Sequence, residues 1–381
     1  MGKAKVFSGL DNLNSVHPIL SGKRVGLMTH PCGISRALES AIDILNANYN
    51  LTALFACEHG IRGDVQAGAK VDNDIDRETG KTVYSLYGKT QMPTDEMMDK
   101  IDVMVVDLQD VGARFYTYLY SMAYAMIACA KHKKPIVILD RMNPVGGSAV
   151  QGTMLDEKFS SFVGKYAVPT RYGLTIGEFA NFVKDHLSLD VELHVSGLTG
   201  WNRDMLWTDT DAFWAPPSPN IPTPEAALMY LGTCIFEGTN LSEGRGTTTP
   251  FEIVGAPFID SAKLEKRMRA LKLKDIAFMR ASFTPTFSKW QGEMCSGVRV
   301  KALTAEANAF EAGLYLLEAI MDMYPNDAKY LGGNDSPLAH FNLLLGTDEY
   351  RLGKIDARGL VEKHRPLVHA FEEESRKYRL Y

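Results

Sequence analysis

The most informative stretch of this sequence is IDVMVVDLQDVGARFYTYLYSMAYAMIACAKHKKPIVILDR, residues 101–141. Two short apolar runs, VMVV and IVIL, flank the helix-like segment TYLYSMAYAMIACAKHK. Strands that are buried on both faces give continuous apolar runs rather than alternating ones. The stretch therefore predicts a strand, a helix and a second strand of a parallel sheet that is covered on both faces.

The same alternation extends toward the N-terminus. The runs RVGLMTH (24–30) and LTALFACE (51–58) predict two more strands, and ISRALESAIDILNAN (34–48) predicts the helix between them. Strands that alternate with helices are typical of βαβ units. Residues 1–200 are therefore predicted to form a Rossmann-like parallel sheet domain of the α/β class.

The rest of the chain has a different composition. Residues 201–258 are rich in tryptophan and proline and then in glycine. Because dense proline excludes a continuous helix or a central strand, we expect an extended segment that lines a cleft. Residues 259–381 contain both helix-like and strand-like runs, which predicts a smaller α+β domain. The long connection over residues 63–88 is expected to be a flap or lid.

The bulk composition is that of a soluble globular protein. The 381 residues are 45% hydrophobic, and no run reaches the roughly 18 apolar residues of a membrane span. The net charge of −5 offers no general attraction to phosphate backbones, so we expect no nucleic-acid partner. The five cysteines form no C-x-x-C pair, which argues against a zinc knuckle or a disulfide framework. The N-terminus lacks an apolar signal region, which fits a cytoplasmic protein or one whose signal has been removed.

Polar side chains follow three consecutive predicted strands. The second strand is followed by Glu58 and His59, the third by Asp107, Gln109 and Asp110, and the fourth by Asp140, Arg141 and Asn143. In open parallel sheets, ligands bind beyond the carboxyl ends of the strands. These residues are therefore predicted to converge on one functional site.

Glu58 and His59 have two interpretations. They are either an acid/base pair or a polar pair that caps the next helix. Gly60 and Gly63 favour the first interpretation, because glycine permits close approach of the backbone to a ligand. The sequence EHG does not match H-E-x-x-H, so zinc-protease chemistry is not supported.

Further candidates lie in two other motifs. Arg114 and Tyr116 stand near a strand end and are expected to face the ligand. Glu237 and Glu243 are interpreted as catalytic, as ligand-orienting, or as ion-paired with Arg245. The segment that holds them has no Walker lysine, and the turn after the first strand is a poor dinucleotide fingerprint, so no phosphate loop and no nucleotide cofactor is expected.

A set of long motifs resembles one family. ACEHGIRG, VDLQDVGARFYTY, DRMNPVGG, WAPPSPNIP, FEGTNLSEGRGTTTPF and FTPTFSKWQGEMCSGV are similar, in this order, to motifs of the exo-β-N-acetylmuramidase family (NamZ-like), a group of bacterial glycosidases. The resemblance runs from about residue 6 to the C-terminus. The sequence departs from the family at THPCGI after the first strand and at RYG (171–173), which bears on substrate detail.

The resemblance implies a specific activity. It points to release of N-acetylmuramic acid from the non-reducing end of peptidoglycan-derived muramyl saccharides, with Glu58 as the leading catalytic acid/base and no cofactor or metal. It also suggests an exported protein, periplasmic or secreted. Glycoside cleavage needs a second carboxylate or the substrate's own acetamido group. Candidates for the carboxylate are Asp107, Asp110, Glu237 and Glu243.

Muramic acid carries a lactyl carboxylate, which a guanidinium binds well in bidentate geometry. The arginines inside the motifs are Arg62, Arg114 and Arg245, and Asn143 and Asn240 are candidates to hold hydroxyls or the acetamido group. Two alternatives remain: a non-catalytic protein that binds cell-wall amino sugars, and a cofactor-dependent enzyme, which the missing glycine fingerprint disfavours.

Overall fold

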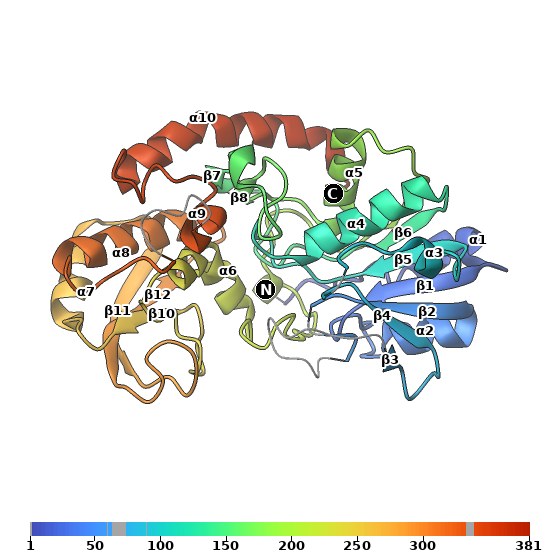
Figure 1. The fold of residues 1–381 in the computed structure, drawn as a ribbon, viewed down its shortest axis with the longest axis horizontal. Helices are drawn as coiled ribbons and strands as arrows, with labels where there is room; N and C mark the ends of the chain where they lie inside the picture. The colour runs from blue at the N-terminus through green and yellow to red at the C-terminus, as the bar shows by residue number, and fades with distance from the viewer. Residues whose placement is uncertain (1, 59, 63–73, 89, 333–338) are drawn as a thin grey trace.

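The computed structural model describes residues 2–58, 60–62, 74–88, 90–332 and 339–381. Two lobes lie side by side in Figure 1, one built on a large sheet and the other on the small sheet that contains β10 to β12. Helix α10 (Ala357–Ser375) runs along the top of both lobes. The predicted α/β class, with a mostly parallel sheet and a smaller C-terminal domain, is confirmed.

The described residues place seven strands in the large sheet, in the order β3-β4-β2-β1-β5-β6-β9. The strands are β1 Arg24–Thr29, β2 Asn50–Ala56, β3 Asp74–Ile75, β4 Thr82–Ser85, β5 Val103–Asp107, β6 Ile136–Leu139 and β9 Leu193–Ser196. Neighbouring strands are parallel except for the β3–β4 pair. The four predicted strands are β1, β2, β5 and β6. Because β2 and β5 lie on opposite sides of β1, the crossover direction reverses between β1 and β5.

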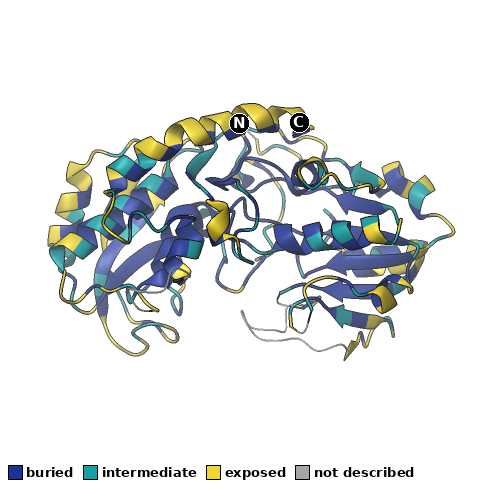
Figure 2. Cartoon of the chain, turned by 45° about the horizontal axis from the view of Figure 1, so that its top comes forward, coloured by how far each residue is buried: buried dark blue, intermediate teal, exposed yellow. Residues whose placement is uncertain are grey.

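Both faces of this sheet are buried, which explains the continuous apolar runs. Leu27 and Leu54 pack on the α2 face, whereas Met28 and Phe55 belong to the core on the opposite face, under α4 and α5. Figure 2 shows the strands as buried and the outer face of α10 as exposed. The helices of this lobe are η1 Leu13–Val16, α1 His17–Leu20, α2 Ala41–Asn48, α3 Asp95–Met98, α4 Tyr118–Lys131 and α5 Ile176–His186.

Two predicted segments differ in the structure. The helix expected over 34–48 begins only at Ala41, because the Ser40 side chain accepts a hydrogen bond from Ile42 N at 3.1 Å and caps it there. The proline-rich segment ends in helix α6 (Pro224–Thr233) rather than extended chain. Proline is tolerated in a first helical turn because the missing N–H has no partner there.

The smaller lobe contains a three-stranded antiparallel sheet in the described part of the chain, in the order β10-β12-β11. The strands are β10 Ile253–Ala256, β11 Ile276–Phe283 and β12 Cys295–Ala302. The helices of this lobe and of the segment before it are η3 Trp207–Asp209, α6, η4 Cys234–Gly238, α7 Ser261–Ala270, α8 Ala309–Met323 and α9 His340–Leu345. The lobe thus combines strands and helices, as the mixed runs of residues 259–381 predicted.

The C-terminal residues return to the large lobe. Helix α10 packs on the hairpin of β7 (Gln151–Met154) and β8 (Pro169–Arg171), where Met154 N donates to His364 Nδ1 at 3.1 Å. The chain then passes through η5 (Arg376–Tyr378). The hydroxyl of Tyr381 donates to Asp140 Oδ2 at 2.7 Å.

Other parts of the chain complete the fold. A short helix, η2 (Glu157–Phe159), follows β7. Of the predicted flap, residues 63–73 lie outside the described residues, and residues 74–85 contain β3 and β4. Within the described ranges, the helices are too short or too polar to cross a membrane.

Candidate active site

Glu58 stands in a tight turn directly after β2. Gly60 N donates to Cys57 O at 3.2 Å and closes the turn. Gly60 has a φ of 73°, a left-handed conformation that glycine adopts without a steric penalty. The turn thus ends the strand at the carboxyl edge of the sheet and leaves Glu58 half-buried. His59, its predicted partner, lies outside the described residues.

Hydroxyl groups surround Glu58. Thr117, at the start of α4, donates its Oγ1 to Glu58 Oε2 at 3.1 Å. The side chain of Tyr87 is hydrogen-bonded to that of Glu58. The pKa of Tyr87 is raised to about 12, mainly by burial and then by the neighbouring Glu58 carboxyl group. The hydroxyl of Tyr118 donates to the main-chain oxygen of Glu58 at 3.1 Å. Tyr87 therefore stays protonated near neutral pH and acts as a donor.

Asp107 lies at the end of β5 and is fully buried. Its carboxylate forms a bidentate pair with Arg141, with distances of 2.5 Å from Nε to Oδ1 and 2.9 Å from Nη2 to Oδ2. Burial lowers the pKa of Arg141, but the charge and the hydrogen bonds of Asp107, with smaller contributions from Cys32 and Asp11, together outweigh burial, so the pKa is raised. The ends of β5 and β6 thus converge, as the sequence suggested, in an ion pair.

The predicted substrate-binding arginines outside the smaller lobe already have partners. Arg62 pairs with Asp76 through Nε at 2.8 Å and with Glu78 through Nη1 at 2.8 Å. Arg114 is fully buried, and burial lowers its pKa to about 10. Its guanidinium donates to the main-chain oxygens of Thr153, of Val168 at 3.0 Å, of Leu344 at 2.9 Å and of Leu345 at 3.0 Å. Arg114 thus joins the β7–β8 hairpin to α9.

Three other candidates bind the main chain. The hydroxyl of Tyr116 donates to Pro217 O at 2.8 Å. Asn143 Nδ2 donates to Leu174 O at 2.9 Å, and the side chain is buried. Asn240 Nδ2 donates to Asp327 O at 2.8 Å, and its Oδ1 accepts from Lys329 N at 2.8 Å. Each of these side chains holds a loop in place.

Glu237, Glu243 and Arg245 form a cluster in the smaller lobe. Arg245 Nη2 lies 2.5 Å from Glu237 Oε1, and its Nε lies 3.3 Å from Glu243 Oε1. Glu243 Oε2 also lies 2.6 Å from Lys289 Nζ. Burial raises the pKa of Glu237, but His340 and Arg245 together outweigh it, so the pKa is lowered. Of the interpretations that the sequence left open, the ion pair with Arg245 is present.

A row of aromatic rings connects the Glu58 turn with this cluster. The ring centroids of Tyr116 and Tyr118 lie 4.9 Å apart, and those of Tyr116 and Tyr230 lie 6.4 Å apart. Tyr230 is 4.6 Å from Phe251, over which the guanidinium of Arg245 stacks at 5.0 Å. The two groups of candidate residues are therefore opposite ends of one packed row.

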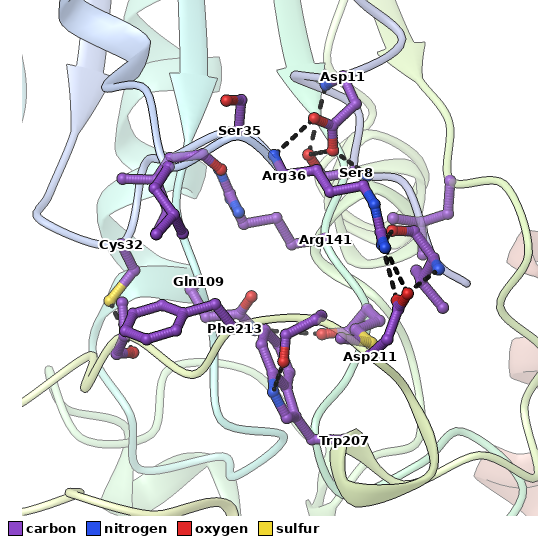
Figure 3. Close-up of a pocket in the computed structure, with 17 residues that line it drawn as sticks. Ser8, Asp11, Cys32, Ser35, Arg36, Gln109, Arg141, Trp207, Asp211 and Phe213 are labelled. Atoms are coloured by element: carbon purple, nitrogen blue, oxygen red, sulfur yellow. Dashed lines mark hydrogen bonds and ion pairs between the residues drawn. The ribbon is translucent and has the colours of Figure 1, made fainter. Parts of the chain in front are cut away.

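A cavity of about 220 Å³ lies at the carboxyl ends of β1, β5 and β6. Figure 3 shows Arg141 near its middle, with Phe213 on one side and Arg36 and Asp211 on the other. The cavity lies where the crossover direction reverses, which is the usual ligand position in open parallel sheets. In the described ranges, no group of three or more His, Cys, Asp and Glu side chains is placed to hold a metal ion.

The segment 215–217 connects this cavity with the Glu58 turn. The Sγ of Cys32, which lines the cavity, donates to Ala215 O at 3.1 Å. The hydroxyl of Tyr118, which binds the main chain of Glu58, also lies 3.2 Å from Pro217 O. Cys32 itself is buried, and burial raises its pKa to about 12.

Sequence reasoning missed Tyr87 and Thr117 as partners of Glu58. Thr117 lies within the VDLQDVGARFYTY motif and could have been chosen as a helix-start hydroxyl that faces a strand end. Nothing in the sequence around Tyr87 marks it, because its position depends on the pairing of β4 with β2.

A parallel sheet with a half-buried glutamate at its carboxyl edge and no nucleotide fingerprint fits a glycosidase of the α/β class. The family model for the N-terminal part of exo-beta-N-acetylmuramidase NamZ matches residues 25–225, and the model for the C-terminal part matches residues 228–381. The chain therefore belongs to the NamZ family of exo-β-N-acetylmuramidases.

Individual relatives agree with this assignment. The peptidoglycan beta-N-acetylmuramidase NamZ of Bacillus subtilis (strain 168) is 44% identical over 389 residues, covering 100% of this chain and 92% of the relative. Two crystal structures of DUF1343 family proteins from Bacteroides fragilis NCTC 9343 match with TM-scores of 0.90 and 0.79, at 35% and 32% identity, each over 99% of both chains. The predicted family and the prediction of a glycosidase are confirmed.

Proposed function

We propose that this protein releases N-acetylmuramic acid from the non-reducing end of peptidoglycan fragments, with Glu58 as the general acid/base. The supporting observation is the position of the Glu58 carboxyl group. It is half-buried at the carboxyl edge of the sheet and receives hydrogen bonds from the hydroxyls of Thr117 and Tyr87. These donors fix the carboxyl group in one orientation, which general acid catalysis requires. The named relative from Bacillus subtilis supports the choice of substrate.

In the proposed reaction Glu58 protonates the glycosidic oxygen as the bond to the anomeric carbon breaks. Glu58 then accepts a proton from the attacking water, which restores the acid. The positive charge that develops on the sugar ring needs a partner, either a carboxylate or the acetamido oxygen of the substrate.

The candidate carboxylates are already occupied. Asp107 is paired with Arg141, and Glu237 and Glu243 are paired with Arg245. Asp110 is buried, and its carboxylate accepts a hydrogen bond from Gly112 N at 2.6 Å. Burial is the main cause that raises its pKa to about 7. We therefore favour assistance by the acetamido group. Retention of the anomeric configuration is expected, and a trifluoroacetamido analogue is expected to react at least tenfold more slowly. Inversion, or equal rates for both substrates, would contradict this step.

The assignment of Glu58 is tested with a chromogenic glycoside of N-acetylmuramic acid. Glu58→Gln is expected to lower kcat by about 10²–10⁴-fold, with little change in substrate affinity. Glu157→Gln serves as the control, because Glu157 is exposed on η2. Full activity in Glu58→Gln would exclude the proposed role. If the wild type binds muramyl saccharides but releases no sugar, the protein is a binding protein instead.

A further inference from the structure

Gln109 presents a fixed acceptor to the cavity of Figure 3. Its Nε2 donates to Asp110 O at 2.8 Å and to Met142 O at 3.1 Å, which establishes which end of the amide is nitrogen. Among the described residues, no donor forms a hydrogen bond with Oε1 of Gln109. Because the residue lines the cavity and is only 2% exposed, this oxygen is preorganised for a ligand N–H or O–H.

Arg141 and Ser35 present donors to the same cavity. Nε and Nη2 of Arg141 are used by Asp107 and by Ile34 O, whereas Nη1 has no acceptor within the described part of the chain. The Oγ of Ser35 accepts a hydrogen bond from the main-chain N–H of Ala37 at 3.2 Å. The hydroxyl hydrogen of Ser35 can therefore be donated to a ligand. An acceptor and two donors thus line one small space, and a secondary amide needs just this combination of N–H and C=O partners.

The charges around the cavity disfavour an anionic ligand, since its lining also includes the Asp11 carboxylate. Arg36 is paired with Asp211, with Nη1 at 2.6 Å from Oδ1. The other guanidinium of the cavity, Arg141, is paired with Asp107. Since each arginine already has a carboxylate partner, an additional anionic ligand gains little.

One wall of the cavity is apolar and open. Phe213 is 62% exposed and Leu38 is 54% exposed, although both are large hydrophobic residues. An exposed aromatic ring at a cavity mouth offers a stacking surface for the apolar face of a sugar ring. The cavity, about 220 Å³, is smaller than the roughly 300–1,000 Å³ sites of drug-sized ligands, so a single ring fits it better than an oligosaccharide.

We propose that this cavity is a binding site for a neutral N-acetylamino sugar, whose acetamido group bonds with Gln109 and Arg141 and whose ring stacks on Phe213. N-acetylglucosamine is a ligand of this class. The choice of a wall-derived sugar rests on the proposed function, whereas the preference for a neutral acetamido group rests on the cavity alone.

The test measures binding of N-acetylglucosamine to the full chain by isothermal titration calorimetry or saturation-transfer NMR. All titrations use the Glu58→Gln background, which is also compared with the wild type. Phe213→Ala is expected to weaken binding at least fivefold, and this exposed position leaves folding unaffected. Phe287→Ala is the matched control, because Phe287 is 47% exposed and lies in the smaller lobe. Unchanged affinity in Phe213→Ala would overturn the proposal.

The ligand series tests the chemistry of recognition. Glucose and glucosamine, which lack the acetyl group, are expected to bind at least fivefold more weakly than N-acetylglucosamine. N-acetylmuramic acid is expected to bind no better at this site, because the arginines are already paired. Equal binding of glucose, or a preference for the muramic acid that depends on Phe213, would contradict the proposal. Because binding is measured with Glu58→Gln, a failure of the proposed hydrolysis leaves this result intact.

Discussion

Hydroxyl groups help to orient the Glu58 carboxyl group, and Thr117 Oγ1 donates to its Oε2 at 3.1 Å. Removal of this donor should let the carboxyl group rotate. We expect Thr117→Val to lower kcat about tenfold with little change in KM, since the loss of one hydrogen bond costs up to about 1.5 kcal/mol. Thr117→Ser, which keeps the hydroxyl, should restore most of the activity. Steady-state kinetics checks this, and equal rates for Val and Ser would count against it.

Arg114 illustrates a residue whose role the sequence could not reveal. It stands in a family motif beside a strand end, where a ligand-binding role was reasonable. Its guanidinium instead donates to main-chain oxygens, two of them in α9, more than two hundred positions later in the sequence. A contact over such a distance depends on the tertiary fold and leaves no local pattern. By contrast, Asp107 and Arg141 could be placed together because they follow neighbouring strands.

The role of Arg114 is testable through stability. Arg114→Lys leaves several buried carbonyl oxygens without a donor, so we expect a loss of about 2–4 kcal/mol in the free energy of unfolding. Urea denaturation measures this value. The KM of the remaining folded enzyme should be unchanged, whereas a ligand-binding arginine would show a raised KM at unchanged stability.

At the scale of elements, the central strands were predictable because nearly all of their residues are buried on both faces of the sheet. Helix α2 was predicted too long, since an apolar period continued through residues 34–40 while Ser40 fixed the actual start. Helix α6 was missed because its proline stands at the first turn and was taken as a helix breaker. Strand β9 was not among the predicted strands. Three of its four residues are only partly buried, so its apolar pattern is weaker.

Helix α10 contains a buried histidine that should make its docking sensitive to pH. Burial, and then the charges of Arg114 and Lys363, lower the pKa of His364 to about 4, with Glu349 opposing. A depressed histidine pKa means that the folded state prefers the neutral ring, which also accepts from Met154 N. The stabilisation is complete above the unfolded pKa of about 6.5 and is lost as the pH falls toward 4.

We expect this histidine to reduce the free energy of unfolding by about 2 kcal/mol between pH 7.5 and pH 5. His364→Gln removes the titrating group and should flatten the profile by that amount. Chemical denaturation at the two pH values checks this. His369 is the control, because its side chain is 70% exposed on the same helix, and His369→Gln should leave the wild-type profile unchanged. Equal slopes for wild type and His364→Gln would refute the assignment.

At the scale of the whole molecule, the C-terminal segment binds the two lobes into one unit. Helix α10 crosses both lobes in Figure 1. After it, Tyr381 contacts residues that follow β6 and β9 of the large sheet. Its hydroxyl donates to the buried Asp140 and accepts from Leu198 N at 2.8 Å. Sequence patterns predicted helices within residues 259–381 but not the surface that α10 covers, because an amphipathic stripe does not specify which core it packs on.

This arrangement predicts cooperative unfolding. Tyr381→Phe removes a donor from Asp140 and should cost about 1–3 kcal/mol. Urea transitions followed by tryptophan fluorescence and by circular dichroism should coincide in both wild type and variant, and should shift together. Two separated transitions, with only one of them moved by Tyr381→Phe, would show that the lobes unfold independently.

The hydrogen bonds by which Arg114 joins the β7–β8 hairpin to α9 affect how loss-of-function surveys of this family are interpreted. In a screen that scores only sugar release from living cells, replacements at this position would rank beside those at Glu58. The two kinds of defect are expected to differ in protein abundance. Variants at Glu58 should accumulate as intact but inactive protein, whereas destabilised variants at Arg114 should be degraded. Immunoblots taken alongside the screen would therefore distinguish variants that have lost stability from variants that have lost catalytic activity.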